Sequence, residues 1–210
     1  MARGNDREYL RGDPVRLKKY LYVLRPLLAV RWLESGRGVV PVPFRELVET
    51  LIPPGALRTA IERLLVAKQV GAELAGRGIG IVYGGGRLGL MGALADAAMA
   101  AGGEVIGVIP EAMVSREVAN HACSELRVVS GMHERKLAFT QLADGFLTLP
   151  GGVGTMDELW EAVSWAQLGY HAKPVGLLNA FGFYDKLLAF NAHMVETGFI
   201  RPAHEHIIMA

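Results

Sequence analysis

The spacing of apolar residues along most of this chain distinguishes short strands from longer helices. Short apolar runs bounded by glycine, proline or polar residues predict strands at 79–83, 105–109, 126–129, 146–149 and 175–178. Helical patterns separate these runs over 90–101, around Arg135, over 155–168 and over 184–196. Strands that alternate with helices predict an α/β fold.

The predicted strands are apolar without interruption, which is typical of parallel strands covered on both faces. We therefore expect a doubly wound, Rossmann-like parallel sheet flanked by helices. In the helix at 155–168, the residues with the spacing of a sheet-facing stripe are Leu159, Ala162, Val163 and Ala166. We expect Trp160 and Trp165 on the same helix to pack or to line a dimer surface, rather than to stack on a ligand.

The first part of the chain has a different character. Its clearest element is an apolar helical run over 18–33, and no strand pattern follows it. The segment 39–44 holds two prolines, which makes an interior strand there unlikely to form. The pattern changes between Pro53 and Val66, and with the start of the family resemblance described below we divide the chain into a helical appendage at 1–65 and a Rossmann-like domain at 66–210.

The segment Pro150–Glu158 follows an apolar strand and precedes a helix, so it has the composition of an anion site. Glycines let the backbone turn sharply and approach a ligand, and the free N–H groups and dipole of a helix start favour a phosphate. The segment has neither the P-loop ending nor the glycine spacing of dinucleotide folds. An alternative reading is structural, because Thr155 and Glu158 have the spacing of a capping box.

A second glycine turn, Gly84–Gly86, also follows a predicted strand. Because ligands of doubly wound sheets bind beyond the carboxyl ends of the strands, both turns can face one crevice. Arg135 and Lys136 lie near the start of their helix, with Leu137 and Leu142 expected in the core. Two positive charges there oppose the helix dipole unless an anion or a carboxylate compensates them. The alternative is a pair of solvated basic residues.

Composition narrows the function classes. The 22 basic and 21 acidic residues nearly balance, so charge gives no argument for nucleic acid. The single cysteine, Cys123, excludes an internal disulfide and fits a reducing cytoplasm; it is either an inert loop residue or a thiol nucleophile. We expect a soluble, cytoplasmic protein, because no apolar run reaches the roughly 20 residues of a membrane span and the charged start lacks the apolar core and cleavage site of a signal peptide. The histidines lack the spacing of a zinc site.

Several motifs together resemble the LONELY GUY family of cytokinin-activating phosphoribohydrolases, long mislabelled as lysine decarboxylases. The run Met-His-Glu-Arg-Lys at 132–136 precedes Pro-Gly-Gly-Val-Gly-Thr-Met-Asp-Glu at 150–158, and Arg135 lies 23 residues before Glu158. Further matching segments are 82–86, 89–92, 103–110 and 173–179. The resemblance covers about 66–208.

The resemblance implies hydrolysis of the N-glycosidic bond of a nucleoside 5′-monophosphate, with release of an N6-substituted adenine and ribose 5-phosphate. It implies Arg135 and Glu158 as the catalytic residues, no cofactor and no metal, no nucleic acid or membrane partner, and a homodimer. The residues that it assigns to substrate binding are Gly84, Gly85, Gly86, Met91, Gly92, Glu117, Arg135, Lys136, Gly152, Val153, Gly154, Thr155, Met156, Asp157, Glu158 and Ser164.

The chain departs from the family pattern in two places. Members open with an apolar strand that ends in Cys-Gly-Ser, and no such segment precedes residue 66; the family also continues beyond the point where this chain stops. A nucleotide-binding module without turnover therefore stays an alternative. The segment from Val15 to about Leu64 resembles the helical C-terminal part of a predicted nucleotidyltransferase family without its catalytic part, so we expect no nucleotidyl transfer.

Overall fold

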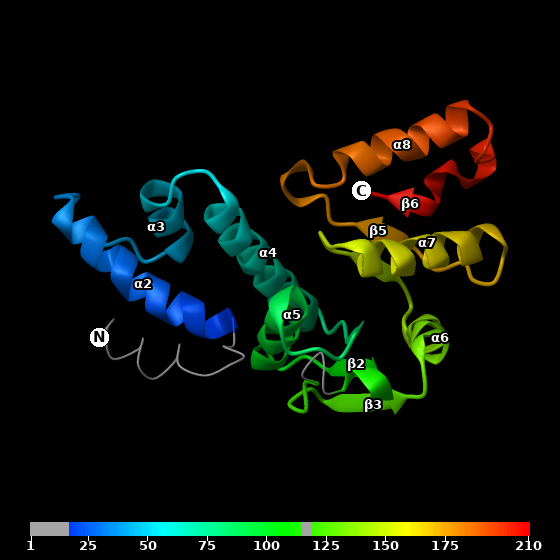
Figure 1. Ribbon diagram of the computed structural model, residues 1–210, viewed down its shortest axis with the longest axis horizontal. Helices are drawn as coiled ribbons and strands as arrows, with labels where there is room; N and C mark the ends of the chain where they lie inside the picture. The colour runs from blue at the N-terminus through cyan, green and yellow to red at the C-terminus, as the bar shows by residue number, and fades with distance from the viewer. Residues whose placement is uncertain (1–16, 115–118) are drawn as a thin grey trace. The chain divides into compact units, whose positions relative to one another are not determined.

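The computed structural model describes residues 17–114 and 119–210, and these form two compact units that divide after Val128. Strands alternate with helices as predicted, and each unit holds one three-stranded sheet (Figure 1). The α/β class is therefore confirmed. No helix among the described residues is long and apolar enough to cross a membrane.

The first unit begins with three helices that share their own hydrophobic core. They are α2 (Leu17–Glu34), α3 (Phe44–Leu51) and α4 (Ala56–Gly76). The buried residues of this core are Leu28, Trp32, Leu47, Val48, Ile52 and Ile61. No strand lies between positions 17 and 80, in agreement with the two prolines at 39–44. The predicted boundary at 65/66 falls inside α4, which continues without a break.

The sheet of the first unit has the order β1-β2-β3. Strand β1 (Ile81–Tyr83) pairs in parallel with β2 (Val105–Pro110), and β3 (Glu125–Val129) completes the sheet after a short 3₁₀ helix, η1 (Glu111–Met113). Helix α5 (Gly89–Ala100) lies beside α4 (Figure 1). The two helices touch at Gly71, where a Cβ would collide with the carbonyl oxygen of Leu94.

The second unit repeats the pattern with the strand order β4-β5-β6. Its parallel strands β4 (Phe146–Thr148), β5 (Val175–Leu177) and β6 (Ile208–Met209) pack with α7 (Val153–Gln167) and α8 (Asp185–Glu196). Short 3₁₀ turns, η2 (Ala180–Gly182) and η3 (Pro202–Ile207), flank α8. Leu159, Ala162 and Val163 are buried in this core, so the predicted stripe of α7 is confirmed at these three positions.

The helix around Arg135, α6 (Met132–Leu142), corrects one expectation. Leu137 was expected in the core, but 44% of its surface is exposed, and Leu142 is only half-buried. Arg135 is the buried residue of this helix, with its guanidinium carbon 5.5 Å from the ring centroid of Phe139. Positions four apart share a helix face, so the face of Arg135 and Phe139 turns Leu137 toward solvent.

A buried polar pair fixes the segment around the first glycine turn. The side-chain amide of Asn120 donates a hydrogen bond to the Tyr83 hydroxyl over 3.0 Å, and both residues are buried. Burial raises the pKa of Tyr83 to about 12, so its hydroxyl stays protonated at neutral pH. The Asn120 backbone N–H donates to the Gly85 carbonyl at 2.8 Å. Asn120 therefore joins the end of β1 to the loop before β3.

We expect Tyr83→Phe to lower the free energy of unfolding by about 1–3 kcal/mol, because the buried Asn120 amide would lose its acceptor. Urea unfolding of the purified chain measures this difference. Tyr170→Phe is the matched control, since the Tyr170 side chain is 75% exposed. Equal stability of Tyr83→Phe and the wild type would contradict the prediction.

Candidate active site

The start of α7 tests the capping-box reading of the glycine segment. The helix begins at Val153, Gly152 is its N-cap residue, and no side chain caps it. Thr155 therefore lies inside the first turn rather than at the N-cap position. The capping-box reading of Thr155 and Glu158 is wrong, because that motif requires the Thr at the N-cap.

The uncapped start leaves backbone donors at the end of β4. The first hydrogen bond of α7 runs from the Met156 N–H to the Gly152 carbonyl over 3.1 Å, so the N–H groups of residues 153–155 have no acceptor within the helix. Gly151 lies against Thr155, where a Cβ would collide with the Thr155 hydroxyl. Three amides and the positive end of a helix dipole can bind an oxyanion such as a phosphate.

Arg135 and Glu158 lie on two helices of the same unit. Arg135 is only 5% exposed near the start of α6, where one of its terminal nitrogens donates to the Met132 sulfur at 3.8 Å. Glu158 is half-buried in the second turn of α7, and Asp157 beside it is exposed. The guanidinium group of Arg135 therefore lies inside the unit rather than in solvent.

Lys136 connects the two helices by ion pairs. Its Nζ lies 2.6 Å from Glu161 Oε2 and 3.4 Å from Asp157 Oδ2, and its side chain is only 13% exposed. The hydrogen bond to Glu161 is the main cause that raises the pKa of Lys136. At the start of α6, the Ser130 N–H donates to Glu134 Oε2 at 2.9 Å, which lowers the pKa of Glu134.

These contacts decide the second open question of the sequence. Arg135 is buried and Lys136 is paired with two carboxylates, so the reading as two solvated basic residues is wrong. The carboxylates of Glu134, Asp157 and Glu161 supply the negative charge that a basic helix start needs. The motif at 132–136 and the motif at 150–158 thus come together in one unit. The contact is the ion pair between Lys136, next to Arg135, and Asp157, next to Glu158.

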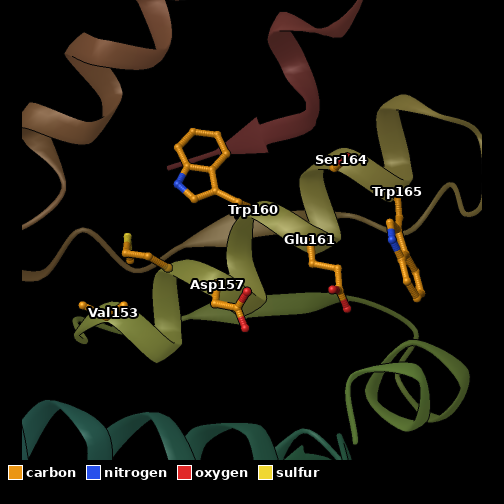
Figure 2. A pocket seen from close by; sticks show the side chains of 7 residues that line it. Val153, Asp157, Trp160, Glu161, Ser164 and Trp165 are labelled. Atoms are coloured by element: carbon orange, nitrogen blue, oxygen red, sulfur yellow. The ribbon is translucent and has the colours of Figure 1, made fainter. Parts of the chain in front are cut away.

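The outward face of α7 forms an open groove of about 540 Å³. Figure 2 shows Asp157 and Glu161 on one side of the helix and Trp165 beyond them, while Trp160 projects toward β6. The residues that line the groove are Val153, Met156, Asp157, Trp160, Glu161, Ser164 and Trp165. Four of them belong to the predicted substrate contacts. Glu161 was missed, although its position four residues after Asp157 places both on one helix face.

The second predicted glycine turn lies in the first unit. Gly84, Gly85 and Gly86 are buried, and Gly85 has a φ of 74°, a conformation that L residues rarely adopt. Gly92 packs so closely on the Arg87 carbonyl that a Cβ would collide with it, and Met91 is partly exposed. Glu117 lies outside the described residues.

The remaining candidates for chemistry give no further centre within 17–114 and 119–210. The Cys123 thiol donates to the carbonyls of Asn120 and Glu125, at 2.9 and 3.1 Å. Among the residues in these ranges, no three His, Cys, Asp or Glu side chains are grouped so that they could hold a metal ion.

Two family models match different parts of the chain. The model described as "Possible lysine decarboxylase" matches residues 91–210, which contain both α6 and α7. The model described as "RNA repair pathway DNA polymerase beta family" matches residues 1–79. The second match agrees with the nucleotidyltransferase resemblance of the first helices.

Curated relatives agree with the first model. The chain is 51% identical over 144 residues to the rice (Oryza sativa subsp. japonica) cytokinin riboside 5′-monophosphate phosphoribohydrolase LOG, covering 69% of this chain and 60% of the relative. It is 48% identical over 144 residues to LOG1 of Arabidopsis thaliana, covering 69% and 68%. The chain spans about three fifths of the length of several rice relatives.

Solved structures agree on the fold. The crystal structure of TM1055, a structural genomics target, superimposes with a TM-score of 0.51 at 27% identity, over 64% of this chain and 75% of that one. The molybdenum cofactor carrier protein of Chlamydomonas reinhardtii gives a TM-score of 0.50 at 24% identity, over 74% and 83%, and supports the fold alone. The matched motifs, the model over 91–210 and the relatives at about 50% identity together show that this chain belongs to the LONELY GUY family, whose family model is described as possible lysine decarboxylase.

Proposed function

We propose that this chain hydrolyses the N-glycosidic bond of cytokinin riboside 5′-monophosphates, which carry an N6-substituted adenine, to the free base and ribose 5-phosphate. The relatives named as cytokinin riboside 5′-monophosphate phosphoribohydrolases support this reaction. The single observation that carries the proposal is the pair of ion pairs that Lys136 forms with Asp157 and Glu161. It joins the helix of Arg135 to the helix of Glu158 within one unit.

Glu158 is proposed as the catalytic carboxylate. Cleavage of a glycosidic bond builds positive charge on the ribose ring, and a carboxylate stabilises this charge or activates the attacking water. The position of Glu158 fits this role because it is half-buried one turn after the uncapped start of α7. A phosphate on the first turn would thus lie within a few residues of the carboxylate along the same helix.

Arg135 is proposed as the second catalytic residue. Its planar guanidinium offers several donors in a fixed geometry, which suits it to orient a carboxylate and to hold a substrate oxygen. Its burial beside Phe139 restricts the side chain before any ligand binds. Such preorganisation lowers the entropy lost when the substrate is positioned.

The 5′-phosphate is proposed to bind at the start of α7, where residues 152–155 leave three amides free of intrahelical bonds. Binding energy from this remote group then helps to position the sugar. The full proposed set of substrate contacts is Gly84, Gly85, Gly86, Met91, Gly92, Glu117, Arg135, Lys136, Gly152, Val153, Gly154, Thr155, Met156, Asp157, Glu158 and Ser164.

A nucleotide-binding module without turnover is the second candidate function. It is favoured by the first unit, which has no strand between positions 17 and 80 and therefore no counterpart of the family's opening strand. Both candidates bind a nucleoside monophosphate, and product release separates them. We propose the enzyme because both catalytic side-chain types are retained.

The proposal extends to domains, compartment and partners. We propose 1–65 and 66–210 as parts of different origin, since the two family models match 1–79 and 91–210 without overlap. A reducing cytoplasm suits a chain with a single cysteine. The proposed reaction uses a small-molecule substrate, without nucleic acid, membrane or cofactor.

The proposed reaction is tested by chromatography of the purified chain with isopentenyladenosine monophosphate and with AMP. We expect free base and ribose 5-phosphate, with the cytokinin nucleotide preferred. Glu158→Gln should lower kcat by about 10²- to 10⁴-fold and leave the Kd of AMP nearly unchanged, because the amide cannot stabilise the cationic ribose or act as a base. Glu196→Gln, an exposed carboxylate on α8, is the matched control.

Three outcomes of this assay are informative. Release that Arg135→Ala and Glu158→Gln both abolish supports the enzyme. AMP binding without release in the wild type supports the binding module. Loss of AMP binding in Glu158→Gln contradicts a role in the chemical step alone and assigns the residue to substrate binding or to the fold.

Lys136 is expected to contribute to stability as well as to substrate binding. Lys136→Met leaves Asp157 and Glu161 without their cation, so we expect the free energy of unfolding to fall by about 1 kcal/mol, less at high salt. A double-mutant cycle with Glu161→Gln isolates the pair. Lys186→Met, an exposed lysine on α8, should change stability little. An interaction energy near zero in the cycle would show that the ion pair does not hold the helices together.

We also propose a homodimer that uses the exposed apolar side chains of α7 and the turn after it. Val153 is 88% exposed and Leu168 67% exposed, and both Val153 and Trp165 line the groove. Sedimentation velocity should give twice the chain mass for the wild type, and Trp165→Glu should shift the equilibrium to monomer. Phe190→Glu on α8 is the control, since this side chain is also exposed. A monomeric wild type would contradict the dimer.

A further inference from the structure

Tyr184 is the largest fully buried side chain of the described residues, with 1% of its surface exposed. It precedes α8 and packs in the core of the second unit with Leu159 and Val163 of α7 and with Val175 of β5. A phenylalanine would fill this apolar site without a polar group. The hydroxyl therefore calls for its own explanation.

The hydroxyl of Tyr184 donates a hydrogen bond to the carbonyl of Leu149 over 2.6 Å. This carbonyl lies between the last residue of β4 and the glycine turn. The Leu178 N–H bonds the Thr148 carbonyl at 2.9 Å, and the next backbone bond beyond the strand joins Met156 to Gly152. The Tyr184 bond holds the backbone between these two points, together with the packing of the buried Pro150 and the contact of Gly151 with Thr155.

The local sequence makes this bond more important. Residue 150 is a proline, which has no N–H and fixes its own φ, so the direction of the Leu149 carbonyl sets how the chain enters Gly151 and Gly152. Both glycines lack a side chain that restricts the backbone. A fixed Leu149 carbonyl therefore restricts the direction in which the amides of residues 153–155 point.

Tyr184 is itself held in place by Asn179 and Phe183. Its backbone N–H donates to Asn179 Oδ1 at 2.8 Å, and Asn179 Nδ2 donates to Asp185 Oδ1 at 2.7 Å. Its ring lies edge-on to Phe183, with 4.9 Å between the centroids and an angle of 87°. Burial raises the pKa of Tyr184, so the hydroxyl stays a donor at neutral pH.

We propose that Tyr184 is a positioning residue for the phosphate site. Its hydroxyl holds the Leu149 carbonyl so that the amides of residues 153–155 point at the 5′-phosphate of the substrate. The inference rests on the proposed function, because that function places the phosphate at the start of α7. Tyr184 acts on the ligand only through the backbone, so its effect should be specific for ligands that carry a phosphate.

Tyr184→Phe is the test, because it keeps the ring and removes only the hydroxyl. The Kd values of AMP and of adenosine are measured by calorimetry for the wild type and the variant. We expect the ratio of the adenosine Kd to the AMP Kd to fall about tenfold in the variant, the equivalent of one hydrogen bond. The KM for isopentenyladenosine monophosphate should rise by a similar factor, with a smaller change in kcat.

Tyr170→Phe is the matched control, as its side chain is exposed and belongs to neither the catalytic nor the binding set. Its two Kd values should match those of the wild type. A thermal melt of each variant shows whether it is folded at the assay temperature. A less stable but folded Tyr184→Phe protein still gives a valid ratio, because the adenosine measurement corrects for a loss of competent protein.

The outcomes separate this inference from the proposed function. An unchanged ratio in Tyr184→Phe, or equal weakening of both ligands, overturns the positioning role even if the wild type releases base. A wild type that releases no base, yet whose preference for AMP falls in Tyr184→Phe, overturns the reaction and supports the positioning role. A wild type that binds AMP no more tightly than adenosine overturns the inference.

Discussion

The ion pairs of Lys136 are the interaction on which the second unit's candidate chemistry depends. They tie the start of α6 to the outward face of α7 through Glu161 and Asp157. Arg135 is next to Lys136 in sequence, and Glu158 is next to Asp157. The ion pairs therefore hold together the two helices that carry the proposed catalytic residues. The side chains of Lys136 and Glu161 are 13% and 23% exposed, whereas that of Asp157 is 54% exposed, so solvent screens the Glu161 pair less than the Asp157 pair.

A second constraint acts on the backbone rather than on side chains. An uncapped helix start is a cost to stability, since orphan amides need acceptors. In this chain the uncapped start follows a glycine turn. Two hydrogen bonds hold the backbone just before this turn, one to the Thr148 carbonyl and one from the Tyr184 hydroxyl to the Leu149 carbonyl. A helix start capped by Thr155 and Glu158 would use up two of the orphan amides and leave fewer for a ligand. The amides of residues 153–155 that take no part in intrahelical bonds are the donors that the proposed function assigns to the phosphate.

Much of this fold was predictable because its elements carry local signals. Pro110 ends β2 and the glycine turns end β1 and β4, so the five predicted strands lie within about two residues of their predicted bounds, while β6 at Ile208–Met209 was not predicted. The errors came from choices that depend on distant residues. The four-residue pattern of Thr155 and Glu158 does not show that α7 starts at Val153, and the apolar character of Leu137 does not show that Arg135 and Phe139 share the inner face. Neither Glu161 as the partner of Lys136 nor Leu149 as the partner of Tyr184 has a signal in one sequence.

Helix α4 shows why the first 65 residues are more than an addition to a complete domain. Ile61 in its first half belongs to the core of the helical part, and Leu74 and Ala75 in its second half pack against the core of β1 and β2. Between them, Gly71 allows close approach of the α5 backbone at Leu94. One continuous helix thus supports both cores, and a cut at position 65 would divide it. Whatever the origin of the first segment, its folding is coupled through α4 to the strand that leads into the Gly84–Gly86 turn.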